Sequence, residues 1–186
     1  LDGKLYAVGG HDVREPYYGC RSVERYDPAV GAWEAVAPLP EARCEFGAAV
    51  LDGKLYAVGG HDGESSQWGL RSVGRYDPAL DAWEYVAPMA EARRFHAVAV
   101  LDGKLYAVGG HDVREPYYGC RSVERYDPAV GAWEAVAPLP EARCEFGAAV
   151  LDGKLYAVGG HDGESSQWGL RSVGRYDPAL DAWEYV

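Results

Sequence analysis

The sequence lacks the features that mark membrane, nucleic-acid-binding and helical proteins. Its 186 residues contain no run of about 18 apolar residues, and they do not begin with a charged segment followed by an apolar core. Lysine and arginine (18) are outnumbered by aspartate and glutamate (29), so the net charge of −11 would repel a phosphate backbone. No long stretch has apolar residues at helical spacing. We therefore expect an all-β protein with neither a membrane nor a nucleic-acid partner.

Cysteine is also scarce. The four cysteines, Cys20, Cys44, Cys120 and Cys144, show no CxxC spacing. A chain of this length needs no disulfide framework to fold. The sequence therefore predicts reduced thiols and a cytoplasmic location.

What the sequence does have is repetition. Residues 51–100 keep 32 of the 50 residues of the segment 1–50, and residues 101–150 repeat 1–50 without a change. Residues 151–186 repeat the start of 51–100, so two unit types, A and B, follow in the order A, B, A and a shortened B. A fixed period of this length predicts one array of stacked units rather than separate domains. Because a natural duplication would show drift, we interpret the chain as engineered.

A hairpin is predicted where one unit passes into the next. Asp52-Gly53 supplies the positive φ angles of a two-residue turn, which would pair a strand ending at Val50-Leu51 with the strand Lys54–Val58. Both faces of that second strand are apolar, so the sheet should be covered on both sides. Gly59-Gly60 then ends the strand.

Three further strands are predicted in the first unit. Ser22–Tyr26 alternates and is closed by Asp27-Pro28, and Trp33–Val36 is stopped by Pro38. Phe46–Val50 carries small apolar residues that suit the crowded axis of a ring. With the strand after the Asp-Gly turn, each unit holds four antiparallel strands, which is one blade of a β-propeller.

The order of residues in each unit resembles the kelch repeat, and the resemblance covers the whole chain. A Gly-Gly doublet is followed by Tyr-Asp-Pro, a Trp, and an Arg before the small-residue strand. The matching residues are Gly9, Gly10, Tyr26, Trp33 and Arg43 in the first unit, and Gly59, Gly60, Tyr76, Trp83 and Arg93 in the second. The resemblance, closest to the kelch domains of ubiquitin-ligase substrate adaptors, implies that Tyr26 and Trp33 pack between blades.

The innermost strand occurs three times, whereas the other three strands occur four times. We expect a first blade without its innermost strand. Another copy of the chain could complete the ring, the chain could belong to a longer array, or the first blade could keep three strands. The sequence does not choose among these.

Most differences between units A and B fall on one rim of the expected ring. Of the 18 differing positions, seven lie at 13–20 and five at 44–48, in the loops after Gly-Gly and before the innermost strand. We call this top face the variable rim. Loop aromatics and the residues after a repeat arginine, where kelch adaptors contact peptides, are the predicted binding residues: Tyr17, Tyr18, Trp68, Arg94, Phe95, Tyr117, Tyr118 and Trp168.

A catalytic function is weighed because one kelch-fold oxidase holds copper with Tyr and His beside a Cys crosslinked to Tyr. The rim carries His11, His61, His111 and His161, one per unit. We expect these histidines to brace their loops and the radius of the ring to separate them, so neither a metal site nor a cofactor is predicted. No spacing identifies a nucleophile with its base. His96 is expected on a strand and packed.

The sequence thus favours an engineered, non-catalytic scaffold that presents the variable rim to a protein or peptide, or to other copies of itself. Two alternatives remain. One is a peptide-binding module of the substrate-receptor type, and the other is a copper-dependent oxidase site on the rim.

Overall fold

The computed structural model describes residues 1–11, 18–63, 69–111, 118–163 and 169–186. Over these ranges the chain forms fifteen β-strands and no helix, so none of the described residues form a helix that could span a membrane. The first sheet holds β1 (Leu5–Val8), β2 (Val23–Asp27) and β3 (Ala32–Ala35), and the second β4 (Gly47–Leu51), β5 (Lys54–Val58), β6 (Val73–Asp77) and β7 (Ala82–Val86). The third holds β8 (Ala97–Leu101), β9 (Lys104–Val108), β10 (Val123–Asp127) and β11 (Ala132–Val136), and the fourth β12 (Gly147–Leu151), β13 (Lys154–Val158), β14 (Val173–Asp177) and β15 (Ala182–Tyr185).

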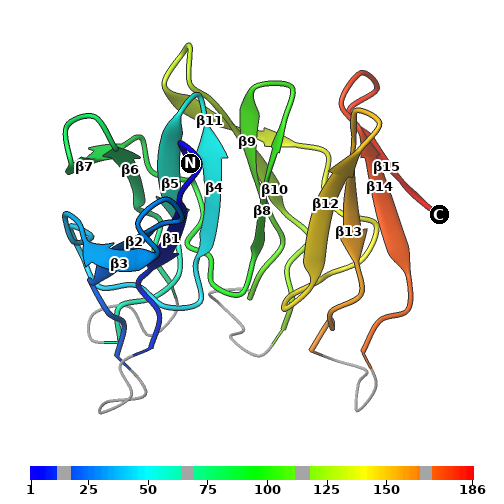
Figure 1. The fold of residues 1–186 in the computed structure, drawn as a ribbon. Helices are drawn as coiled ribbons and strands as arrows, with labels where there is room; N and C mark the ends of the chain where they lie inside the picture. The colour runs from blue at the N-terminus through cyan, green and yellow to red at the C-terminus, as the bar shows by residue number, and fades with distance from the viewer. Residues whose placement is uncertain (12–17, 64–68, 112–117, 164–168) are drawn as a thin grey trace.

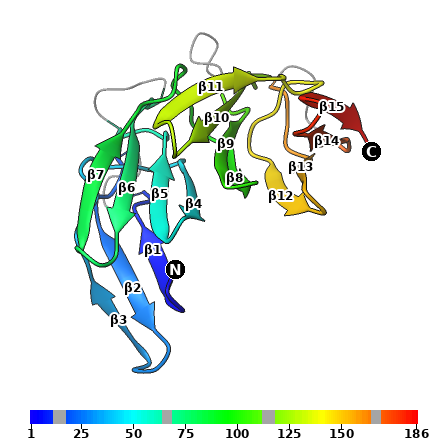
Figure 2. The ribbon, with the colours of Figure 1, turned by 90° about the horizontal axis from the view of Figure 1, so that it is seen from above.

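The four sheets are propeller blades arranged in an arc (Figure 1, Figure 2). Within each sheet the strands are antiparallel and follow one another in chain order. The strands β4, β8 and β12 line the inner side of the arc, where β8 contacts both of the others. The expected all-β propeller is confirmed, and the first sheet has three strands in the described chain.

The predicted hairpin at Asp52-Gly53 forms as expected. Asp52 and Gly53 have φ angles of 49° and 68°, and β4 pairs with β5 from Leu51↔Lys54 to Gly47↔Val58. The strand after the turn begins and ends at the predicted residues. The three further strands predicted from the first unit, at 22–26, 33–36 and 46–50, form with bounds shifted by one residue.

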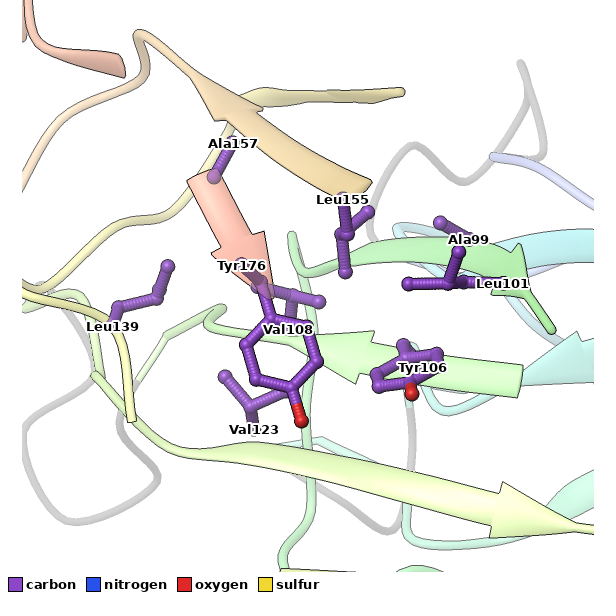
Figure 3. Packing of buried hydrophobic residues seen from close by; sticks show 9 residues of the cluster. All are labelled: Ala99, Leu101, Tyr106, Val108, Val123, Leu139, Leu155, Ala157 and Tyr176. Carbon is purple, nitrogen blue, oxygen red and sulfur yellow. The ribbon is translucent and has the colours of Figure 1, made fainter. Parts of the chain in front are cut away.

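The core consists of apolar layers between successive sheets. In Figure 3, Tyr106 and Val108 of β9 face Leu155, Ala157 and Tyr176 of the fourth sheet. The alternate residues of the same strand, Leu105 and Ala107, point the other way and pack with residues of the second sheet, such as Tyr56 and Val58. The apolar pattern on both faces of this strand type is therefore explained by a neighbour on each side.

Tyrosine and tryptophan join neighbouring units, as the kelch resemblance implies. Trp83 Nε1 donates a 2.9 Å hydrogen bond to the carbonyl oxygen of Ala37 in the preceding unit, and Tyr76 beneath it is fully buried. Trp133 and Trp183 make the same bond to Ala87 and Ala137.

The prediction is wrong for Trp33. This ring packs against Tyr26 of its own sheet but is 51% exposed, since no other sheet of the described chain covers the outer face of the first sheet. In this chain the repeat tryptophan is thus partly buried only where a preceding unit lies against it.

This contrast between two equivalent tryptophans can be tested. Trp83→Ala should lower the free energy of unfolding by about 3–5 kcal/mol, because it removes a large side chain from a packed joint together with its hydrogen bond. Trp33→Ala, the matched control, should cost less than half as much. Urea unfolding of both variants provides the comparison, and equal losses would show that the packing of Trp83 has been misread.

Units A and B also fit each other on the inner side of the arc. A Cβ atom added to Gly47 in β4 would lie 2.1 Å from Cγ2 of Val98 in β8, so the small residue of unit A makes room for the larger residue of unit B. Gly147 occupies the same position in the third unit, and its added Cβ would meet only the carbonyl oxygen of Val158 at 3.9 Å.

Gly47→Ala should therefore destabilise the chain by about 1–3 kcal/mol through overpacking. Gly147→Ala, which has an identical local sequence, should change stability by less than about 0.5 kcal/mol. Urea midpoints measure the difference. If Gly47→Ala were as stable as the parent, Val98 would have another position available, and the packing of β4 against β8 would leave room for a methyl group.

Candidate functional site

The variable rim is built from short backbone bridges that tie each loop to its own unit and to the next. It lies on the lower side of the molecule in Figure 1. His11 pairs with Gly19, and Cys20 with Arg43, inside the first unit. Cys44 then pairs with His61 of the second unit. The loops of successive units are therefore held side by side at this rim.

Next to these bridges, one residue per unit takes part in a series of backbone hydrogen bonds that runs from unit to unit. The N–H of Phe95 donates to the carbonyl oxygen of Glu45 at 2.9 Å, and the N–H of Glu145 donates to that of Phe95 at 3.0 Å. All three residues have φ angles between 53° and 55°, in the left-handed region that non-glycine residues seldom adopt. These backbone hydrogen bonds bring three equivalent positions of successive units side by side.

Arg94 and Phe95, two of the predicted binding residues, lie together in this row. Arg94 Nη1 is 3.5 Å from Glu45 Oε2 of the preceding unit, and its guanidinium carbon is 5.6 Å from the centre of the Phe95 ring. The Phe95 ring lies 4.8 Å from that of His111 in the next unit. A cation and an aromatic ring are thus presented together, half-buried, between units.

Tyr18 and Tyr118 also lie on this rim, and each is 38% exposed. Their role as binding residues stays a prediction. The other predicted aromatics, Tyr17, Trp68, Tyr117 and Trp168, lie outside the described residues.

The histidines are closer together than the sequence suggests. The rings of His11 and His61 are 6.5 Å apart, and those of His111 and His161 are 6.3 Å apart. The expectation that the radius of the ring separates them is wrong, because the bridge from residue 44 or 144 to the next unit draws neighbouring loops together.

Burial keeps two of these histidines neutral. It lowers the pKa of His111 to about 4, with the positive charge of Arg94 as the next cause. The pKa of His61 is also lowered by burial, against the opposing effect of Glu45. Both imidazoles are therefore uncharged at neutral pH and can act as acceptors or ligands.

Cys44 and Cys144 lie beside histidines but are not activated nucleophiles. Burial, followed by the negative charge of the neighbouring Glu45 or Glu145, raises the pKa of each thiol to about 12. Each S–H donates to the carbonyl oxygen of the facing histidine at 3.3 Å. Because the thiolate is the reactive form, neither residue is suited to nucleophilic catalysis in this state.

His96 is buried, with 7% of its surface exposed, so the prediction that it packs is confirmed. It directly precedes β8 rather than lying on it. Its ring lies against Gly59 and Gly47, where added Cβ atoms would meet it at 2.9 Å and 3.3 Å. The side chain fills the inner side of the arc and takes no part in the rim.

Sequence reasoning missed the clustering of cysteine with histidine. The signal was present, because Cys44 and Cys144 recur in register with the histidine of the following unit. Only the pairing between units, which the sequence does not display, brings the two residue types into contact.

The fold and the repeated residues define a kelch-repeat propeller. The chain belongs to the kelch-repeat family, since residues 1–186 match the family model described as the KLHDC2/KLHL20/DRC7 Kelch-repeats domain. Kelch-repeat domains are generally protein-interaction modules.

Similar curated proteins match over short segments. The human protein named Kelch repeat and BTB domain-containing protein 13 is 56% identical over 41 residues, which are 22% of this chain and 8% of that protein. Mouse Kelch-like protein 35 is 57% identical over 42 residues, 23% of this chain and 7% of that protein. The matched segments thus span less than a tenth of either relative.

Proposed function

We propose that this chain is a protein- or peptide-binding module that contacts its partner through the variable rim, without catalysis. The observation that carries the proposal is the combination of variation and exposure at one rim. Twelve of the 18 differences between units A and B fall in the segments 13–20 and 44–48 of the unit, and the described residues there include exposed Tyr18 and Tyr118.

The chemistry of the rim supports binding of a peptide with acidic and aromatic groups. Arg94 and Phe95 offer a guanidinium and a ring face in one place, while tyrosines at the edge combine apolar contact area with a hydroxyl. The protonated thiols of Cys44 and Cys144 argue against a nucleophilic enzyme.

The exact repetition of residues 1–86 in residues 101–186 supports an engineered scaffold. Four free cysteines suit a reducing compartment such as the cytosol. Alternating A and B units would present the same rim chemistry at regular intervals, so the partner could equally be another copy of the chain.

The proposal is tested with peptides selected from a random displayed library against the purified chain. The double variant Tyr18→Ser/Tyr118→Ser should bind the selected peptides at least about tenfold more weakly, because aromatic anchors dominate binding surfaces. Its free energy of unfolding should change by no more than about 1 kcal/mol, since both side chains are partly exposed. Isothermal titration calorimetry and urea unfolding measure the two quantities.

The matched control is Val30→Ser/Val130→Ser, which alters two side chains that are 74% exposed in turns at the opposite rim. This variant should bind the peptides like the parent. If the selected peptides kept their affinity for the tyrosine variant but lost it for the valine variant, the binding face would be the opposite rim and the proposal would be wrong. Native mass measured on the same variants tests self-association.

A further inference from the structure

The joint between the third and fourth units holds two imidazoles and a thiol at close range. The ligand atoms of His111, Cys144 and His161 all lie within 4.8 Å of one another. Cys144 Sγ is 3.5 Å from Nδ1 and 3.6 Å from Nε2 of His161. His111 comes from the third unit's Gly-Gly loop, Cys144 from the segment before β12, and His161 from the fourth unit's loop.

His111 is a buried polar group. Only 8% of its surface is exposed, and neither of its buried ring nitrogens has a hydrogen-bond partner among the described residues. A buried polar group normally has a partner, because an unpaired one costs about 1–3 kcal/mol. The imidazole therefore offers its ring nitrogens to the cluster as potential ligand atoms.

The spacing suits a tetrahedral metal ion. With metal–nitrogen bonds of about 2.0–2.1 Å and a metal–sulfur bond of about 2.3 Å, ligand atoms around zinc lie roughly 3.3–3.6 Å apart. The cysteine–histidine distances already fall in this range, and no separation within the cluster exceeds 4.8 Å. The His161 side chain is 32% exposed, so its ring has room to rotate toward a bound ion.

We propose that His111, Cys144 and His161 form a binding site for a borderline divalent metal ion, zinc in particular, that ties the third unit to the fourth. Thiolate and imidazole are the ligands that such ions prefer over carboxylate and water. On binding, the thiol loses its proton to solvent, and the S–H bond to the backbone is replaced by the bond to the metal. Glu145 Oε2, 3.7 Å from His161 Nε2, lies where it can orient the imidazole.

The equivalent joint between the first and second units offers a weaker cluster. Its ligand atoms belong to His11, Cys44 and Glu45, so one imidazole is replaced by a carboxylate. Arg94 already places a cation 3.5 Å from that carboxylate. His61 Nδ1 accepts a 2.9 Å bond from the N–H of Gly63, which holds this ring in place. The two joints thus provide a matched pair with identical local sequence.

The experiment titrates Co²⁺, a spectroscopic substitute for Zn²⁺, into the whole chain after chelator treatment in the presence of a phosphine reductant. We expect a thiolate-to-cobalt charge-transfer band that saturates at about one ion per chain in the tight phase, and its loss when Zn²⁺ displaces Co²⁺. Zn²⁺ should raise the melting temperature, because it binds the folded state. A chain without a charge-transfer band at excess Co²⁺ would overturn the proposal.

Matched variants identify which residues produce the charge-transfer band. Cys144→Ser should abolish the band of the tight phase and weaken Zn²⁺ binding by more than about 100-fold, beyond the effect of losing a supporting group. Cys44→Ser, which replaces an equally buried thiol, should keep the tight phase. His161→Gln, at a partly exposed position, should also remove the tight phase while leaving the circular dichroism of the fold unchanged. Tight binding that survives in Cys144→Ser or His161→Gln contradicts the site.

Partner binding and metal binding can be separated. The metal titration uses no peptide, and the ligands do not include Tyr18 or Tyr118. If the rim binds peptides but the chain binds no zinc, only the metal-site proposal is wrong. If the chain binds zinc but no peptide is selected, the metal-site proposal stands and the peptide-binding proposal is wrong.

Discussion

The rest of the structure depends on one arginine per joint, buried between successive units. Arg43 donates from Nη1 to the carbonyl oxygens of Gly59 at 2.7 Å and Ser72 at 3.0 Å, both in the next unit, and its side chain is fully buried. Arg93 and Arg143 repeat these bonds one unit further on each time. The Gly59 carbonyl stands where the Gly-Gly doublet leaves β5, and Ser72 directly precedes β6, so the arginine of one unit holds both ends of the rim loop in the next.

A buried guanidinium is stable only if its charge and its N–H groups are matched, and the two joint types achieve this differently. Between units A and B, Arg43 pairs with Glu41, which also accepts from the hydroxyl of Ser72, and Nε has no partner among the described residues. Between units B and A, Glu124 is itself buried and accepts from Arg93 at Nε and Nη2. The two unit types therefore differ in the charged groups of their joints as well as in the residues of the rim. An array built from a single unit type would lose one of these two charge arrangements.

The fold could be predicted from the sequence because its determinants are local. Asp52-Gly53 specifies a tight turn by backbone conformation alone, and the apolar pattern of Lys54–Val58 requires cover on both faces. What the sequence did not reveal depends on contacts between units. Trp33 is exposed although its local sequence matches that of the partly buried Trp133, and His111 and His161 approach each other because a backbone bridge at Cys144 joins their units. The predicted binding residues are an intermediate case. The loop position of Tyr18 is consistent with its exposure, whereas the contact of Arg94 with Glu45 arises only when the units stack.

The same contacts decide what chemistry the rim can support. Burial raises the pKa of Cys144 and lowers that of His111, so each group is held in its neutral form at neutral pH. A catalytic cysteine–histidine pair needs the opposite trend, with a thiolate stabilised by a nearby imidazolium. Neutral imidazoles are ready ligands, and a divalent cation compensates for the burial of a thiolate by direct bonding. The burial that keeps the Cys144 thiol protonated is therefore compatible with a metal ion, and a metal there would reinforce the joint that Arg143 already stabilises.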